Sequence, residues 1–423
     1  MTRSKRITVI LLMAITALTI GCQKEQEYLP GFDEDVDVDM DVDIDVNAFS
    51  EEDMRILQNS LNISSNPYNY AELSLPSHFT DGELDPMDNM PDDNLTTNMG
   101  ATLGRVLFYD KNLSKNNTIA CASCHQQKHS FSDPNQFSSG LYGGHTTRNS
   151  MNLINTRYYQ TGRFAWDERA ASLEDMVLLP IQDPIEMNMD LKDLEDKLRQ
   201  IEYYPILFRY AFGNEEVTTN RIANALAQYI RSIVSYNTKF DEGMRLTGNP
   251  FVAEGIPLFP NYTPLEKEGQ QIFFSGTEHQ ANCLYCHGGP AMTVPEGEDD
   301  MAKNNGLDLI YTDKGKGSIT LLSDDNAKFK VPSLRNIEFT APYMHDGRFK
   351  TLEEVIDHYS EGVVQHSNLH FRLSTVDDGP PGGPPKKLFL SQYEKDALIA
   401  FLKTLSDEDI ITDKKYSNPF KGQ

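Results

Sequence analysis

Two short cysteine motifs constrain this chain more than any other feature. Both have the form Cys-x-x-Cys-His, and they are Cys121-Ala-Ser-Cys124-His125 and Cys283-Leu-Tyr-Cys286-His287. Two thiols at this spacing reach the two vinyl groups of one porphyrin, while the imidazole of the next residue reaches its iron. A cysteine pair can instead form a redox dithiol or hold zinc, but these pairs lie far apart and each is followed by histidine. The sequence therefore predicts two covalently bound haem c groups.

The remaining cysteine, Cys22, ends a segment that is typical of export signals. Basic residues precede an apolar run over Ile7–Ile20, and Gly21-Cys22 follows it. Such a segment is excluded from the fold, and its end resembles a bacterial lipoprotein signal. We predict a signal peptide over 1–22 and an exported protein that a lipid on Cys22 anchors to a bacterial membrane, facing the periplasm or the cell surface. An uncleaved signal anchor, or cleavage elsewhere, is the alternative. No cysteine is left for a structural disulfide.

Residues 23–99 have the composition of a tether and an irregular lead-in. Asp alternates with Val, Met or Ile over Gly31–Asn47. As a strand this segment would place a ladder of unpaired carboxylates on one face, so we expect a disordered acidic tether. Calcium binding by the Asp ladder is the alternative. From Ala48 the chain is rich in Asn, Asp and Pro, with one amphipathic stretch near Glu51–Leu61.

The rest of the chain predicts two domains that are mainly α. The first spans 100–247, a Pro- and Gly-rich linker spans 248–264, and the second domain spans 265–410. Apolar residues at helical spacing predict helices in five segments; these are Ser172–Leu179, Leu191–Ile201, Thr219–Tyr236, Leu265–Phe274 and Ser391–Leu405, with a further helix around Leu103–Leu107. Strand signals are scarce, so the predicted fold is two cytochrome c-like haem domains in tandem.

The net charge limits the class of partner. A formal charge of -25 at pH 7 argues against nucleic acid, because phosphate binding needs clustered cations. An acidic surface instead suits a basic partner.

Spacing alone does not fix the sixth ligand of each haem, which decides between electron transfer and reactivity.

A series of longer motifs resembles one known family. They are LGRVLFYDKNLS, CASCH followed by FSD, TRNSMNLIN, FAWDERAASLEDM, PIQDPIEM, CLYCHGGP, FKVPSLRN and TAPYMHDGRFKTLEEVIDHY. Their order over about Gly100–Leu405 resembles bacterial di-haem cytochrome c peroxidases and their relative MauG. The resemblance implies that peroxide reacts at haem 1, on His125, and that haem 2, on His287, supplies or stores an oxidising equivalent.

The same resemblance implies two catalytic residues. Trp166 matches the tryptophan between the two haems, which relays electrons; without the motif it would be read as a core aromatic residue. Glu186 matches the distal glutamate that moves a proton between the peroxide oxygens; alternatively it is an exposed loop acid. Met176 stands where the peroxidases usually carry Gln, and this departure affects the predicted distal pocket.

The sixth ligands implied by the resemblance are His145 and Tyr359. His145 is the candidate that would ligate haem 1 at rest, next to Gly143 and Gly144, which permit movement; alternatively it is a surface histidine, and His129 and His78 are weaker candidates. Tyr359 stands at the haem 2 position that is Met in typical peroxidases and Tyr in MauG. The alternatives to Tyr359 are Met292, Met344 and His358.

The resemblance also implies a calcium ion, several arginine roles and a set of partners. The calcium would be bound by the Asn149 side chain and the carbonyls of Thr340 and Pro342, since Ca²⁺ takes oxygen ligands. Arginines could bind haem propionates or form surface ion pairs; they are Arg148, Arg163, Arg169, Arg335 and Arg348. The expected partners are hydrogen peroxide, a small electron-donor cytochrome or cupredoxin, and a second copy of the chain in a homodimer.

Three functions follow from this interpretation. The favoured one is a peroxidase that reduces hydrogen peroxide to water with electrons from a small redox carrier. A MauG-like oxidase that modifies a protein or a small molecule is the second. A di-haem electron carrier without enzymatic activity is the third, and it would have two six-coordinate haems.

Overall fold

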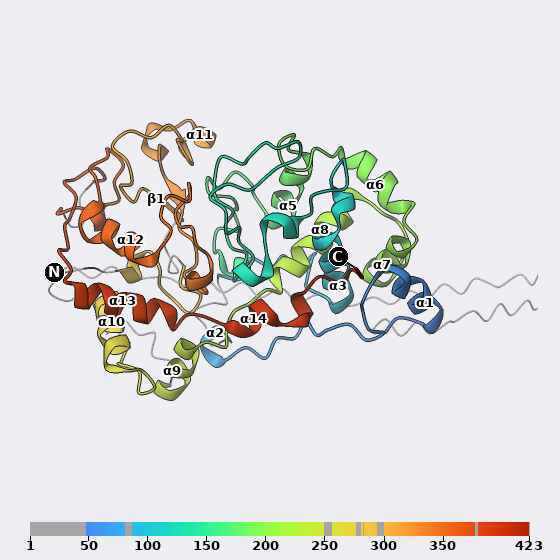
Figure 1. The fold of residues 1–423 in the computed structure, drawn as a ribbon, viewed down its shortest axis with the longest axis horizontal. Coiled ribbons are helices and arrows are strands. Elements are labelled where there is room, and N and C mark those ends of the chain that lie inside the picture. Colours follow the sequence, from blue (N-terminus) through green and yellow to red (C-terminus); the bar gives the residue numbers. More distant parts are fainter. Residues whose placement is uncertain are drawn as a thin grey trace, which may run out of the picture. The chain divides into compact units, whose positions relative to one another are not determined.

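Two helix pairs, each crossing at a glycine, organise the two halves of the molecule (Figure 1). Helix α3 (Asn98–Tyr109) packs on α8 (Thr219–Arg231), and α10 (Pro264–Ser275) packs on α13 (Gln392–Lys403). A Cβ atom added at Gly104 would stand 1.9 Å from the Ala225 carbonyl oxygen, and one added at Gly269 would stand 1.9 Å from that of Ala397. The absence of a side chain at these glycines therefore lets each pair approach closely.

This computed structural model describes residues 48–80, 87–248, 256–275, 281, 283–293, 300–376 and 380–422. Residues 45–423 form one compact unit. The predicted signal peptide, Cys22 and the acidic tether lie outside the described residues, as do residues 249–255 of the predicted linker over 248–264. The domain boundaries stay a prediction.

The described elements are helices, apart from one two-stranded sheet. The remaining α-helices are α1 (Glu51–Ser60), α2 (Ser77–Thr80), α4 (Cys121–Cys124), α5 (Leu173–Gln182), α6 (Leu191–Arg199), α7 (Tyr203–Phe212), α9 (Lys239–Thr247), α11 (Gly317–Thr320), α12 (Leu352–Asp357) and α14 (Glu408–Thr412). Strands β1 (Ala302–Lys303) and β2 (Phe329–Lys330) pair antiparallel. Short 3-10 turns lie at Lys111–Leu113, Gln127–His129, Thr156–Tyr158, Cys283–Tyr285, Ser323–Asp325, Ile337–Phe339, Phe371–Leu373 and Lys414–Tyr416, and a π-helical turn lies at His358–Gly362.

The helices begin where the sequence supplies caps. Thr97, Thr218 and Ser391 accept hydrogen bonds from backbone N–H groups in the first turns of α3, α8 and α13. Such caps satisfy N–H groups that have no partner within the helix. The mainly helical prediction is confirmed, and each predicted helix is present. The helix predicted over Thr219–Tyr236 ends earlier, at Arg231. Several helices were not predicted, among them α7, α9, α12 and α14.

Two large apolar clusters form the core. The first surrounds α3, α5, α7 and α8, and the second surrounds α10, α12 and α13. The largest fully buried aromatic side chains include Phe108, Phe131 and Tyr229 in the first cluster and Phe240, Phe259 and Phe273 in the second. Cys121 of the first motif packs on the first cluster, whereas the second motif contacts both, Cys286 on the first and Cys283 on the second. Each predicted cofactor attachment site thus has apolar support.

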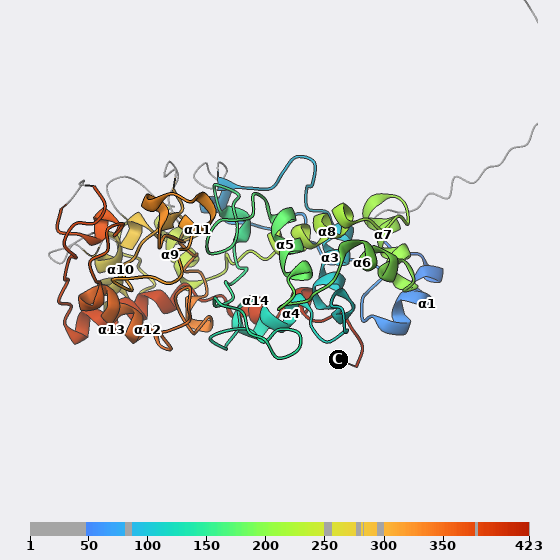
Figure 2. The ribbon, with the colours of Figure 1, turned by 90° about the horizontal axis from the view of Figure 1, so that it is seen from above.

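Both ends of the described chain pack on the first cluster (Figures 1 and 2). Helix α1 contacts α7 and buries Met54 and Leu57, so the predicted irregular lead-in contributes to the core. Beyond α14, Tyr416 is buried among aromatic rings and its carbonyl accepts hydrogen bonds from Tyr109 and Tyr229 at 2.7 and 3.0 Å. The C-terminal segment thus joins the half of the molecule that carries the first motif.

Among the described residues, no helix is both long and apolar enough to span a membrane.

Candidate active site

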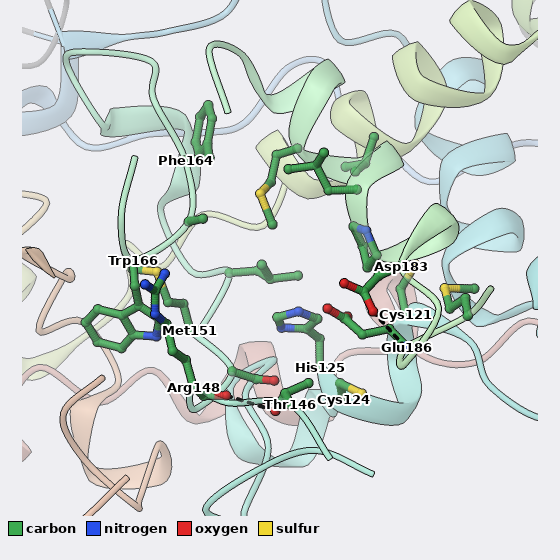
Figure 3. Close-up of a pocket in the computed structure, with 18 of the residues that line it drawn as sticks. Cys121, Cys124, His125, Thr146, Arg148, Met151, Phe164, Trp166, Asp183 and Glu186 are labelled. Atoms are coloured by element: carbon green, nitrogen blue, oxygen red, sulfur yellow. Dashed lines mark hydrogen bonds between the residues drawn. The ribbon is translucent and has the colours of Figure 1, made fainter. Parts of the chain in front are cut away.

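The first Cys-x-x-Cys-His motif lines a cavity of about 700 Å³ (Figure 3). Cys121 and Cys124 form the ends of the one-turn helix α4, and His125 follows as its C-terminal cap. This turn brings both thiols and the imidazole to one cavity wall. The volume lies within the range of cofactor pockets. Asn152 also lines this cavity, and its buried Oδ1 has no hydrogen-bond partner among the described residues. The cavity is therefore built to receive a further group.

The second motif lines a separate cavity of about 210 Å³. Cys283, Cys286 and His287 reach it from a 3-10 turn. The two histidines are held alike: Nδ1 of His125 lies 2.9 Å from the Phe131 carbonyl, and Nδ1 of His287 lies 3.1 Å from that of Pro332. A carbonyl only accepts, so Nδ1 carries the proton and Nε2 carries the lone pair that a metal needs.

Burial keeps both imidazoles neutral at neutral pH. Burial lowers the pKa of His125, against the opposing effect of its hydrogen bond to Phe131. Burial likewise lowers the pKa of His287 to about 4. All four motif cysteines are free of disulfide bonds. The donor set at each cavity, two thiols and one neutral imidazole, fits a covalently attached haem c.

Glu186 lies on the wall of the first cavity, near Cys121 and His125 (Figure 3). Asp183, which caps the end of α5, accepts hydrogen bonds from the backbone N–H groups of Ile185 and Glu186 at 2.8 and 3.3 Å. This turn fixes the backbone that carries the Glu186 carboxyl. Burial and the negative charge of Asp183 raise the pKa of Glu186, and Arg169 opposes them. The carboxyl is therefore biased toward its protonated form.

Trp166 and Lys330 line both cavities, and no other residue of the described chain does so. The Trp166 indole N–H donates to the Asn149 carbonyl at 2.7 Å. The Lys330 backbone N–H donates to the Trp166 carbonyl at 2.8 Å. The indole is thus held between the two motif sites. Sequence reasoning placed Trp166 through the resemblance and did not single out Lys330.

Tyr359 lies in the π-helical turn and lines the second cavity. Burial raises the pKa of its phenol to about 12, and the Asn305 amide approaches its oxygen at 3.5 Å. Among the alternatives, Met344 also lines this cavity, whereas Met292 and His358 do not. His358 instead pairs its Nε2 with the Asn305 carbonyl at 3.0 Å. The geometry therefore keeps Tyr359 and Met344 as the candidates.

The three histidines considered as ligands in the first cavity lie elsewhere. His145 is exposed, pairs with Ser139 in an isolated bridge, and does not line the cavity. His129 also lies outside the cavity lining. His78 is buried, and its Nε2 lies 2.7 Å from the Asp241 carboxylate. The structure thus offers no support for a resting ligand from these residues.

Two of the five predicted arginines line a cavity, whereas Arg163, Arg335 and Arg348 line neither. Arg148 and Arg169 line the first cavity and both pair with Asp167. Arg335, in contrast, is completely buried against Asp241 at 2.7 Å and lines neither cavity. Its guanidinium is held by protein groups, so the predicted propionate role does not suit Arg335.

The residues predicted for calcium come from two adjacent segments. The Asn149 N–H donates to the His345 carbonyl at 2.8 Å. This hydrogen bond joins the segment of Asn149 to the segment that carries Thr340 and Pro342. The Asn149 amide nitrogen donates to the carbonyls of Asn135 and Gln136 at 3.1 and 3.2 Å.

Comparisons with known proteins agree on one family. The model of the family described as di-haem cytochrome c peroxidase matches residues 98–249. The chain is 32 % identical over 308 residues to methylamine utilization protein MauG of Methylophilus methylotrophus, which covers 72 % of this chain and 82 % of that protein. It is 32 % identical over 312 residues to cytochrome c551 peroxidase of Nitrosomonas europaea, covering 73 % and 80 %. The crystal structure of a MauG-like protein associated with microbial copper homeostasis is 31 % identical, has a TM-score of 0.65, and covers 82 % of this chain and 99 % of that chain.

Proposed function

Because the chain belongs to the di-haem cytochrome c peroxidase and MauG family and is therefore an oxidoreductase, we propose that it is a peroxidase that reduces hydrogen peroxide to water. Membership of this di-haem family implies two haem c groups. We assign haem 1 to Cys121, Cys124 and His125, and haem 2 to Cys283, Cys286 and His287. The proposal depends mainly on one observation, which is that Glu186 lines the first cavity.

When bound, haem 1 supplies the iron at which the O–O bond of peroxide breaks. Cleavage needs a base for the proton of the bound peroxide and then an acid for the departing water. The Glu186 carboxyl can serve as both, because its raised pKa brings proton uptake and release closer to neutral pH. Asp183 holds the Glu186 backbone through the hydrogen bond from its N–H group.

Trp166 is proposed to relay electrons between the two haem sites, because this residue lines both cavities. Two external electrons complete each turnover, and we propose a small cytochrome or cupredoxin as their source. The charge of -25 favours a basic donor, since complementary charge raises the encounter rate.

A MauG-like oxidase that modifies a protein or small molecule is the second candidate. Tyr359 favours it, because this phenol lines the second cavity at the position where the family varies between Tyr and Met. A phenolate ligand stabilises the oxidised states of iron, whereas a thioether raises the potential. Both candidates share peroxide chemistry at the first cavity and differ in what is oxidised.

Further parts of the proposal concern location and assembly. We propose that the protein is exported and anchored by a lipid on Cys22, and that it can form a homodimer. We also propose that Asn149, Thr340 and Pro342 hold one Ca²⁺. The adjacent placement of the Asn149 and His345 segments supports the calcium part.

The variant Glu186→Gln tests the proposed function. It removes the titratable proton and preserves the shape of the side chain, so we expect peroxide turnover to fall by about 10²-fold or more, the usual contribution of general acid–base catalysis. Peroxide consumption would be measured with a reduced small cytochrome and with a small-molecule reductant, and haem content by absorbance. Glu353→Gln, at an exposed site, is the matched control. Unchanged turnover with both haems present would remove Glu186 from the mechanism.

A further inference from the structure

Lys330 is a buried cation outside the set of residues that the proposed reaction uses. Its side chain is only 2 % exposed. The ammonium donates to the Arg163 carbonyl at 2.9 Å and lies 4.0 Å from the centre of the Tyr159 ring. A second ring, that of Phe164, lies 5.9 Å away. An ammonium has three N–H donors, and these contacts satisfy one of them by a hydrogen bond.

The nearby protein carboxylate does not neutralise this cation. Glu168 is the acidic group whose charge acts on Lys330, but its Oε2 atom binds the Lys316 ammonium at 2.9 Å. The described residues give Lys330 no ion pair. Burial lowers the pKa of Lys330 to about 8, with Glu168 opposing. A buried charge is costly without an ionic partner, so this site is incomplete with respect to an anion.

The position of Lys330 identifies the anion by its chemistry. Lys330 lines the first cavity and the second, as Trp166 does. Its backbone N–H donates to the Trp166 carbonyl at 2.8 Å, so the strand that carries the ammonium also supports the indole. A haem brings propionate carboxylates into the cavity that it occupies. Carboxylate is the group that a buried ammonium binds best through charge-assisted hydrogen bonds.

We propose that Lys330 binds a haem carboxylate where the two cavities meet, and that its positive charge sets the driving force of electron transfer between the haem sites. A nearby positive charge stabilises the reduced iron, which carries less charge, and so raises its midpoint potential. Lys330 is in this sense a positioning and tuning residue for the relay through Trp166. The inference rests on the proposed function only in requiring a haem at each motif.

A purely structural role for Lys330 makes a different prediction. If the side chain only braced the loop at Arg163 and packed against Tyr159, any residue that kept this packing would preserve both potentials. A charge role requires the potentials to follow the charge at position 330. Two unit charges about 10 Å apart at an effective dielectric constant of about 20 interact strongly enough for roughly a tenfold effect on the reduction equilibrium.

The test compares Lys330→Gln and Lys330→Arg in the holoprotein. Midpoint potentials would be measured by spectroelectrochemical titration, haem content by absorbance, and peroxide turnover separately with a small-molecule reductant. We expect Lys330→Gln to lower the potential of at least one haem by about 59 mV, which is tenfold for one electron. We expect Lys330→Arg to retain most of the wild-type value. Lys192→Gln, which removes an exposed cation that is paired with Glu195 and lines neither cavity, should leave both potentials unchanged.

Each other outcome is also decisive. Unchanged potentials in Lys330→Gln with both haems bound would overturn the proposal, as would an equal loss in the Gln and Arg variants. Failure of the Gln variant alone to retain haem, with Arg intact, would support the charge role. If both variants fail to fold, the requirement is steric and the charge role is overturned. Absence of peroxide turnover in the wild type would contradict the proposed function and leave the measurement of potentials valid.

Discussion

Replacing Asp241 by Asn should cost this protein about 3–5 kcal/mol of stability. The Asp241 carboxylate is completely buried and accepts hydrogen bonds from the Arg335 guanidinium at 2.7 and 2.9 Å. It also lies 2.7 Å from His78 Nε2, and it accepts hydrogen bonds from the Thr238 N–H and hydroxyl at 2.9 and 2.7 Å. The Asn variant keeps the shape but leaves the Arg335 cation buried without its counter-charge.

The magnitude follows from the cost of that unpaired cation. Removing one partner of a buried ion pair typically costs about 3–5 kcal/mol. Two unit charges about 4 Å apart at an effective dielectric constant of about 20 give an interaction of about 4 kcal/mol, which agrees. The exposed pair of Asp357 and Lys395, 2.8 Å apart, is the matched control, because Asp357→Asn there should cost about 1 kcal/mol at most.

The assay is urea unfolding of the holoprotein at pH 7, followed by circular dichroism. The double variant Asp241→Asn with Arg335→Met should lose less than the sum of the two single variants, because it leaves neither charge unpaired. A loss below about 0.5 kcal/mol in Asp241→Asn alone would refute the reasoning, since it would mean that Arg335 finds another partner at no cost.

The same pair predicts a pH dependence with a definite sign. Burial alone would raise the pKa of Asp241, but the Arg335 charge and the hydrogen bonds from His78 and Arg335 outweigh it and hold the pKa well below its ordinary value. A carboxyl with a depressed pKa stabilises the fold above its unfolded pKa, and this stabilisation is lost as pH falls through the folded pKa. The extra stability of wild type over Asp241→Asn should therefore persist down to about pH 4 and shrink as the pH falls further.

Three further predictions concern the helix crossing and the two cavities. Gly104→Ala should destabilise the fold by about 1–3 kcal/mol in thermal unfolding, because its Cβ would overlap the Ala225 carbonyl; an unchanged melting temperature would exclude tight packing there. Asp183→Ala should lower peroxide turnover by roughly tenfold with haem content intact, because it frees the Glu186 backbone; wild-type turnover would show that this turn is dispensable. Tyr359→Phe should change the absorption spectrum of haem 2, and an unchanged spectrum would exclude the phenol as its ligand.

Local spacing made the cofactor attachment sites predictable. Cys121, Cys124 and His125 lie within about one helical turn, so the sequence alone brings them to one wall. Helix periodicity and caps such as Thr218 located the main helices for the same reason. The proposed roles of Glu186 and Trp166 came from the resemblance, because the spacing of residues around a single carboxylate or indole does not indicate a function.

Partners distant in sequence were not predictable in this way. Arg335 was expected either at a haem propionate or in a surface ion pair, but it forms a buried pair with Asp241, 94 positions away. Lys330 follows Phe329 in a two-residue strand, a pattern that also fits an exposed strand end, and its burial depends on the loop at Arg163. Tyr416 follows the predicted end of the second domain, and its contacts with the first cluster have no local signal.

The two cavities share one attachment chemistry but differ in the groups that surround it. The first contains a carboxyl, Glu186, whose raised pKa suits proton transfer, while the second contains the Tyr359 phenol, whose pKa is raised to about 12 and which can complete an iron's ligand set. Under the proposed function, such a division would separate peroxide chemistry from electron storage. The two sites would then need a connection. Among the described residues, those that line both cavities are Trp166, the proposed relay, and Lys330, a cation. If the charge at Lys330 tunes the potentials, then the same strand that positions the relay also sets the direction of electron flow through it.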